Sequence, residues 1–196
     1  MHLSKLFKTQ KLLDIRIVDE HNLHGQDLLP QKILSLQVEL AELAQNWRGF
    51  KFWSKDQEPR INIRVCKTCG EYLCDTQDSC DSCDYIGAPS EPIIKNPLLE
   101  EFVDGLHFIF SIGNDLEINI ELYTILPFKH KTILDQFSQT YYVIGDLEHD
   151  PSQEGLITVL QYLLGLGEML GFTTDQIKQS YYAKNKINHQ RQTDQY

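Results

Sequence analysis

Four carboxylates in two pairs are the first residues of this sequence whose spacing suggests chemistry. Glu39 and Glu42 lie three residues apart in "LQVELAELAQNW", and Glu101 and Asp104 repeat that spacing in "LLEEFVDGL". On a helix, side chains three residues apart share one face. Four carboxylates meeting between two packed helices would repel one another unless cations lay among them.

Magnesium is the cation that such a cluster suits best, because oxygen ligands match this hard ion and leave coordination positions for substrate phosphates. Only Arg48 and Lys51 provide positive charge nearby in sequence, which is too little to neutralise four acids. The alternative is a solvated acidic face or ordinary salt bridges between helices. The second pair lies on an otherwise apolar segment, which favours the interpretation as a site for two or more Mg²⁺ ions.

A second group of polar residues lies near the C-terminus, in "SYYAKNKINHQRQTDQY". Lys184, Asn188 and Arg191 are spaced to share one side of a helix, and Asn185 and Gln192 flank them. Arginine matches phosphate oxygens with two parallel donors, and lysine supplies a point charge. The alternative is a basic, solvated helix end, which is common because cations favour that end of the helix dipole. Beside a carboxylate cluster, this face predicts a site for a metal-bound polyphosphate.

The five cysteines form a third group, confined to "CKTCGEYLCDTQDSCDSCD". Two C-x-x-C pairs, Cys66/Cys69 and Cys80/Cys83, fit a tetrahedral Zn²⁺ site of four thiolates, with Cys74 between them. Four thiolates close the coordination shell, so we expect a structural role rather than a catalytic one. An iron–sulfur cluster and redox thiols are the alternatives.

Composition limits the class of protein. The chain has 196 residues and a formal net charge of −10, which argues against a general nucleic-acid binder. The N-terminal segment lacks the apolar run of a signal peptide, and no apolar segment reaches the length of a membrane span. An odd number of cysteines without an export signal indicates a reducing cytoplasm.

The elements that must position these groups are helices. Apolar residues recur at helical spacing in six segments, namely 7–22, 30–48, 97–114, 129–146, 153–171 and 174–192. Thr173 or Thr174 is expected to cap the last of them, with Gln176 close behind. Residues 117–126 alternate apolar and polar side chains, so helix and strand both remain open there. We predict an all-α helical bundle formed by residues 1–57 and 95–196, with residues 58–94 as an inserted cysteine-rich module.

Four blocks of the sequence together resemble the dimeric, all-α dUTP pyrophosphatases, which are related to MazG-type nucleotide pyrophosphohydrolases. These blocks are "VELAELAQNWRGFKFWS", "NPLLEEFVDGLHFIFSIGND", "LGEMLGF" and "YYAKNKINHQRQTDQY", and they occur in the family's order. The resemblance implies Mg²⁺-dependent hydrolysis of dUTP to dUMP and pyrophosphate by a homodimer. It implies no role for the cysteine module, which the core of the family does not require.

The resemblance also assigns residues. Glu39, Glu42, Glu101 and Asp104 match the metal ligands, and Glu42 is our choice for orienting or deprotonating the attacking water. Gln10 in "TQKLLD" matches an amide suited to reading the edge of uracil. The other matches are Lys51 and Trp53 near the nucleotide, Lys184, Asn185, Asn188 and Arg191 at the phosphates, and Tyr182 and Tyr196 flanking them.

One departure from the family pattern leaves alternatives open. Asn46 stands where the family usually has a glutamate, which puts the number or affinity of metal ions in question.

His107 is expected to be a core histidine with satisfied hydrogen bonds rather than a metal ligand. The alternative functions are hydrolysis of another nucleotide, such as dCTP or a damaged nucleotide, and a non-catalytic zinc-binding interaction protein on the same scaffold.

Overall fold

The described part of the chain is almost entirely helical. The computed structural model describes residues 3–69, 73 and 92–194. Within them, six α-helices carry the fold, together with two short strands and one 3₁₀ turn. The helices are α1 (Leu3–Glu20), α2 (Leu29–Trp47), α4 (Pro97–Asp115), α5 (Ile133–His149), α6 (Gln153–Met169) and α7 (Thr174–Thr193). The all-α bundle expected from the sequence is confirmed.

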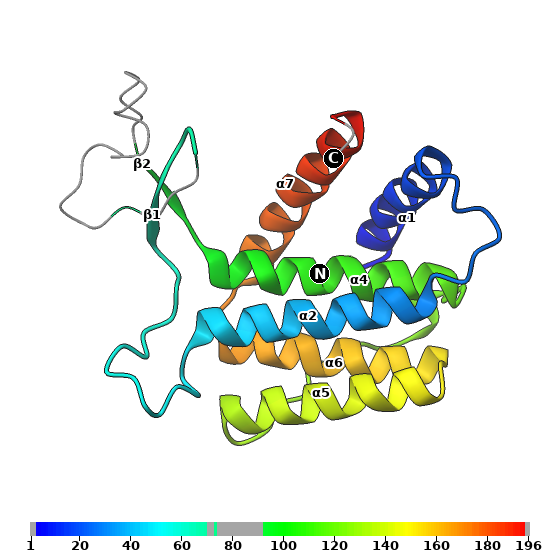
Figure 1. Ribbon diagram of the computed structural model, residues 1–196. Coiled ribbons are helices and arrows are strands. Elements are labelled where there is room, and N and C mark those ends of the chain that lie inside the picture. Colours follow the sequence, from blue (N-terminus) through cyan, green and yellow to red (C-terminus); the bar gives the residue numbers. More distant parts are fainter. Residues whose placement is uncertain (1–2, 70–72, 74–91, 195–196) are drawn as a thin grey trace.

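Helix α4 is the centre of the core. Its apolar residues are buried on nearly every side, and Phe102, Val103, Leu106, Ile109 and Phe110 have no measurable exposure. It packs against α1, α2, α6 and α7. Figure 1 shows α2 and α4 running side by side, with α5 and α6 next to them and α1 and α7 rising from the opposite side. A helix surrounded in this way needs apolar side chains all round, as its sequence provides.

Local sequence explains where the helices begin and end. Asn96 caps α4 by accepting a hydrogen bond from the backbone N–H of Leu99 at 3.0 Å. Thr173 and Gln176 form a reciprocal capping box at the start of α7, which confirms the expected cap. Helix α2 ends at Trp47, and the next residue, Arg48, has a φ of 66° in the left-handed region, which turns the chain away.

The connection between α4 and α5 differs from the sequence-based expectation. Residues 117–126 form neither a strand nor an α-helix; their only regular part is the 3₁₀ turn Ile120–Leu122. Helix α5 was expected to begin at residue 129, but it begins at Ile133 because Thr132 caps it. The residues before that cap run across α6, where the backbone oxygen of Phe128 lies so close to Gly165 that any side chain there would collide with it. The fully buried Gln136 holds this crossing by accepting from the His130 N–H and donating to the Phe128 carbonyl.

Two strands flank the cysteine-rich segment. Strand β1 (Ile63–Cys66) pairs antiparallel with β2 (Pro92–Lys95), so that Cys66 lies opposite Pro92. These strands were not predicted from the sequence, because four residues are too few for an alternating pattern to be recognised. Of the predicted zinc ligands, Cys66 is buried and Cys69 is exposed. Cys80, Cys83 and Cys74 lie outside the described residues, so the zinc site stays a prediction.

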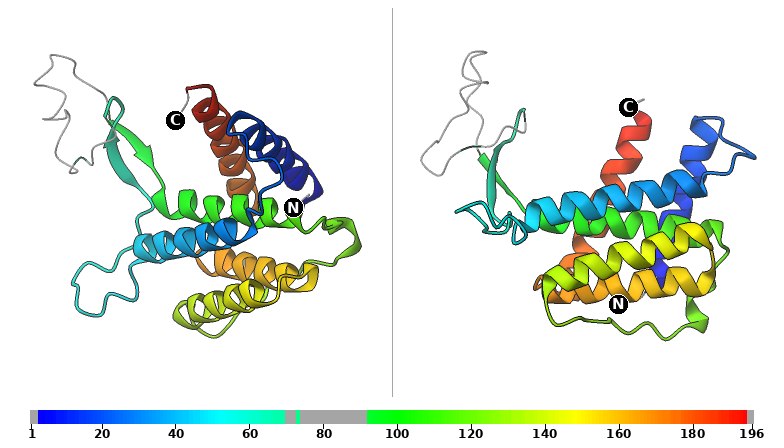
Figure 2. Two further views of the ribbon diagram at one scale, coloured as in Figure 1. Left: turned by 45° about the vertical axis from the view of Figure 1, so that its right-hand side comes forward. Right: turned by 60° about the horizontal axis from the view of Figure 1, so that its bottom comes forward.

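Helices α1 and α7, together with α2 and α4, enclose a cavity. Both α1 and α7 contact α4 and each other, and Figure 2 shows both projecting from the same side of the other four helices. Arg16 of α1 ties their ends together by donating to the backbone oxygen of His189 at 2.7 Å. Among the described residues, no single helix is both long and apolar enough to cross a membrane; α6 and α7 pass only as a pair, with a bend of 113° between them.

Candidate active site

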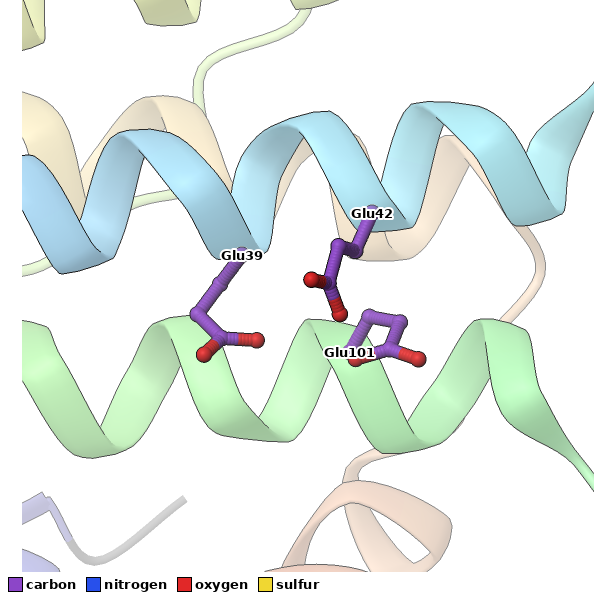
Figure 3. Close-up of side chains that lie close together, drawn as sticks. All are labelled: Glu39, Glu42 and Glu101. Atoms are coloured by element: carbon purple, nitrogen blue, oxygen red, sulfur yellow. The ribbon is translucent and has the colours of Figure 1, made fainter.

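Three of the predicted carboxylates meet in the structure. Glu39 and Glu42 project from α2 towards Glu101 of α4, and each offers an oxygen within 4.8 Å of those of the other two (Figure 3). The meeting follows from the packing of α2 on α4, which is the most extensive helix contact in the fold. Helical spacing alone placed Glu39 and Glu42 on one face, and the packing of α2 on α4 adds Glu101, which is 59 residues after Glu42 in the sequence.

Asp104, the fourth predicted ligand, lies beside this group rather than in it. Its carboxylate forms an ion pair with the Nζ atom of Lys184 from α7. Both side chains are largely buried, which makes this pair stronger than an ion pair at the surface. Asp104 is nevertheless close enough for its charge to raise the pKa of Glu39. The structure therefore brings all four predicted acids to one region, with a lysine at its edge.

The electrostatics of the cluster favour a bound cation. Burial is the main cause that raises the pKa of Glu39 to about 7, and the neighbouring carboxylates of Asp104, Glu101 and Glu42 add to it. Burial likewise raises the pKa of Glu101 to about 7, followed by the charges of Glu42 and Asp104. A proton or a metal ion would relieve the same repulsion. A donor set that consists only of carboxylate oxygens fits Mg²⁺ and contains no nitrogen or sulfur ligand that a softer metal would prefer.

Asn46, the departure from the family pattern, touches this cluster. Its Nδ2 atom lies 3.3 Å from the Glu101 Oε1 atom and also 3.3 Å from the backbone oxygen of Glu42. An amide at this place donates a hydrogen bond to a carboxylate and adds no negative charge. The residue therefore orients Glu101 where a glutamate would have provided a further anionic ligand.

A cavity of about 430 Å³ extends from the carboxylates along the space between α1, α2, α4 and α7. Glu39 and Asp104 line it, whereas Glu42 and Glu101 do not. Lys184, Asn188 and Arg191 of the predicted phosphate face line the same cavity. Gln10 of α1 also lines the cavity, so the predicted base-reading amide and the predicted phosphate ligands face one space. Its volume suits a nucleotide-sized ligand.

Four predicted substrate residues lie elsewhere. Lys51, Trp53, Tyr182 and Asn185 are not among the residues that line this cavity. Trp53 is 66% exposed and Phe52 is 86% exposed, in a loop where the two rings meet edge to face. Asn185 is buried in α7, and its Nδ2 atom has no hydrogen-bond partner among the described residues. Roles for these four residues at the nucleotide stay predictions, and Tyr196 lies outside the described residues.

The structure adds cavity residues that sequence reasoning missed. The most informative is Asp14, whose carboxylate accepts hydrogen bonds from Gln10, Ser111 and Asn114. Asp14 lies one turn after Gln10, so its position on the same face of α1 was visible in the sequence. Ser111 and Asn114 gave no comparable signal, because they belong to a different helix and only the packing of α1 on α4 brings them to Asp14.

His107 is a core histidine, as expected, but only half of its hydrogen-bonding capacity is used. Its Nδ1 atom lies 2.8 Å from the backbone oxygen of Val103, and its ring stacks on Tyr181 with centroids 4.0 Å apart. Its Nε2 atom is buried without a partner among the described residues. Burial lowers the pKa of His107 to about 4, so the ring is neutral at physiological pH.

The fold and the site together define a helical bundle with an acidic cluster that borders a nucleotide-sized cavity through Glu39. The sequence matches the dUTPase family over residues 2–66 and 89–196, which leaves out most of the cysteine-rich segment. The chain belongs to the dUTPase family. No individual curated protein matches the sequence.

Family membership gives the reaction. The protein is a hydrolase that converts dUTP to dUMP and pyrophosphate, and dUTP is its substrate. The family generally uses Mg²⁺. Neither hydrolysis of a different nucleotide nor a non-catalytic scaffold is favoured by the match.

Proposed function

We propose that Glu39, Glu42, Glu101 and Asp104 hold Mg²⁺ and thereby position the triphosphate of dUTP for hydrolysis. The convergence of three carboxylates within 4.8 Å, with a fourth beside them, carries this proposal. When bound, two or more Mg²⁺ ions would neutralise the cluster and the phosphates and act as Lewis acids. Asn46 orients Glu101 and keeps the number of anionic ligands at four.

The chain's own residues then divide the work. Lys184, Asn188 and Arg191 line the same cavity as Glu39 and Asp104 and bind the phosphates through hydrogen bonds and positive charge. Asn185 lies on the same helix, one residue after Lys184, with an unpartnered amide that can support this face. Tyr182 flanks it. Phosphoanhydride hydrolysis depends mainly on such charge stabilisation and alignment, with no covalent intermediate required.

Glu42 is the group that orients or deprotonates the attacking water, with Glu39 as its neighbour. Of the three clustered glutamates, Glu42 is the most exposed, so water can reach its carboxylate. Replacing Glu42 with glutamine keeps the shape and removes the base. We expect a loss of turnover of about 100-fold or more in Glu42→Gln, in line with what general-base catalysis usually supplies. Full turnover in this variant, measured as pyrophosphate release, would remove Glu42 from this role.

Gln10 reads the base at the other end of the cavity. Its amide offers both a donor and an acceptor, which matches the edge of uracil. The experiment is to measure pyrophosphate release from dUTP, dCTP and dTTP with Mg²⁺, for the natural protein and for Gln10→Ala. Selective turnover of dUTP that becomes less selective in the variant supports the assignment. A Gln10→Ala enzyme with unchanged selectivity would contradict it.

The remaining assignments concern the assembled protein. A homodimer is supported by the resemblance to the dimeric family and by the exposed Phe52 and Trp53 rings, which offer apolar area for contact. Lys51 and Trp53 act near the nucleotide. Cys66, Cys69, Cys80 and Cys83 bind a structural Zn²⁺ ion, and the protein works in the cytoplasm. Metal analysis of the purified protein tests the zinc, and light scattering tests the dimer.

A further inference from the structure

A continuous chain of hydrogen bonds surrounds the amide of Gln10. The hydroxyl of Tyr181 donates to Gln10 Oε1 at 3.0 Å, and Gln10 Nε2 donates to Asp14 Oδ1 at 2.8 Å. Ser111 donates to the same oxygen of Asp14 at 2.9 Å, and Asn114 donates to Oδ2 at 3.0 Å. This hydrogen-bond network joins α7, α1 and α4, and three of its residues, Gln10, Asp14 and Ser111, line the cavity.

These partners allow the Gln10 amide one orientation only. A carboxylate can only accept hydrogen bonds, so Asp14 requires the NH₂ group of Gln10 on its side. The carbonyl oxygen of Gln10 must then face Tyr181, whose hydroxyl donates to it. A rotation of the amide by 180° would place the oxygens of Gln10 and Asp14 against each other. It would also leave the Tyr181 hydroxyl only the more distant backbone oxygen of Leu6, at 3.4 Å, as an acceptor. Gln10 is almost completely buried, so water cannot repair that mismatch.

The orientation matters because uracil and cytosine differ by exchange of donor and acceptor. At positions 3 and 4, uracil presents an N–H donor and an oxygen acceptor, whereas cytosine presents a nitrogen acceptor and an NH₂ donor. An amide free to rotate could match either base at similar cost. An amide fixed in one orientation matches only one of them and leaves buried groups unpaired with the other.

We propose that Asp14 and Tyr181 are positioning residues that fix the orientation of the Gln10 amide, and that this fixation sets the preference for uracil over cytosine. The inference rests on the assignment of Gln10 as the base-reading residue. It adds that Gln10 alone is not sufficient for selectivity. The ring of Tyr181 is itself held by stacking on His107 and by complete burial, so its hydroxyl has little freedom to move.

The test is the ratio of kcat/KM for dUTP to that for dCTP in Asp14→Asn and Tyr181→Phe. An asparagine at position 14 can donate as well as accept, so it no longer forbids the rotated amide. We expect the ratio to fall about 10-fold in Asp14→Asn, which corresponds to one hydrogen bond of about 1.4 kcal/mol. Tyr181→Phe, which keeps the ring, should lower the ratio about threefold.

Matched controls separate positioning from loss of structure. Asp146→Asn and Tyr142→Phe make the same chemical changes at exposed positions of α5, and both should leave the ratio unchanged. A general structural defect would lower activity on both nucleotides equally and leave their ratio as it was, which would overturn the proposal. If Asp14→Asn does not fold, the same ratio of kcat/KM values is measured in Tyr181→Phe.

The outcomes also distinguish this proposal from the one on which it rests. A changed ratio in Gln10→Ala, with unchanged ratios in Asp14→Asn and Tyr181→Phe, would leave Gln10 as the base reader and overturn only the fixation. An unchanged ratio in all three variants would overturn both. A changed ratio in all three, with both controls unaffected, is the expected result.

Discussion

The two ends of the cavity use carboxylates in opposite ways. At one end, Asp14 accepts three hydrogen bonds from neighbouring side chains. At the other, the carboxylate of Glu39 forms no hydrogen bond with the described residues, and other carboxylates lie around it. The first arrangement is complete and rigid, which suits recognition of a base. The second is left with unbalanced negative charge, which suits a cation.

The contrast shows how one fold separates recognition from chemistry. Both ends rest on α4, which provides Ser111 and Asn114 to one and Glu101 and Asp104 to the other. The distance between them is set by helix geometry rather than by loops, so the reacting phosphates and the base are held in a fixed relation. Variants can therefore affect one end while leaving the other intact.

The largest effect is expected at the acidic end. Glu101→Gln removes one anionic ligand, and we predict that turnover of dUTP falls about 100-fold or more while Mg²⁺ binding weakens, because the metal loses a charged oxygen. Pyrophosphate release and calorimetric titration with Mg²⁺ measure the two effects. The matched control Glu100→Gln changes the neighbouring residue on α4. A Glu101→Gln protein with normal Mg²⁺ affinity would contradict the assignment.

The phosphate face should show the next largest effect. Arg191→Ala removes a guanidinium from the cavity wall, so we predict a drop in kcat/KM for dUTP of about 10-fold to 100-fold, comparable with the loss of a charge-assisted hydrogen bond. Steady-state kinetics measure it. Lys178→Ala, on the first half of the same helix and outside the cavity lining, is the control. Equal behaviour of the two variants would argue against phosphate contact at Arg191.

The pH dependence of stability sharpens the electrostatic half of the contrast. Glu39 and Glu101 have pKa values of about 7 in the folded state, compared with an ordinary value of 4.5. In the folded state these two glutamates therefore bind more protons between these values, and they lower the free energy of unfolding as pH rises from about 4.5 to 7. Burial lowers the pKa of His107 from 6.5 to about 4, which offsets the effect of one glutamate below pH 6.5, so two raised groups against one lowered group leave a net decrease. With EDTA, we predict a Tm that falls over this range, and Mg²⁺ should restore it at pH 8.

The control for this pH effect is the double variant Glu39→Gln/Glu101→Gln. Both glutamates with raised pKa values are removed and His107, with its lowered pKa, remains, so the Tm of this variant should no longer fall as pH rises and should respond less to Mg²⁺. A natural protein whose Tm rises between pH 5 and 8 in EDTA would show that other groups dominate and that the acidic cluster is not strained in this way.

The smallest effect on folding is expected in the exposed loop. Trp53→Ala should change the free energy of unfolding by no more than about 0.5 kcal/mol, because the side chain is mostly exposed. If Trp53 acts near the nucleotide in the assembled protein, KM for dUTP should rise in the same variant. Phe52→Ala, in the same loop, is the comparison. An unchanged KM in Trp53→Ala would remove the tryptophan from the nucleotide site.

The sequence was sufficient to predict the helices and the acidic cluster, because both depend on strong local patterns. Apolar periodicity marked all six helices, and two carboxylate pairs at helical spacing marked the faces that meet. The late start of α5 at Ile133 was not predictable in this way, because it depends on how the backbone at Phe128 crosses α6 at Gly165.

The network around Gln10 shows the same limit within the site. Gln10 was predicted from family resemblance, but nothing in the local sequence connects it with Ser111, Asn114 or Tyr181. Those contacts arise only when α1, α4 and α7 pack together. Likewise, the pairing of Lys184 with Asp104 joins two residues that the sequence assigned separately, one to phosphate and one to metal.

A crystal structure with Mg²⁺ and a non-hydrolysable dUTP analogue would test the central claim most directly. We predict that Glu39, Glu42 and Glu101 would hold Mg²⁺ through their carboxylates and that Lys184 and Arg191 would contact the phosphates of the analogue. Magnesium and triphosphate bound away from these three glutamates would contradict it.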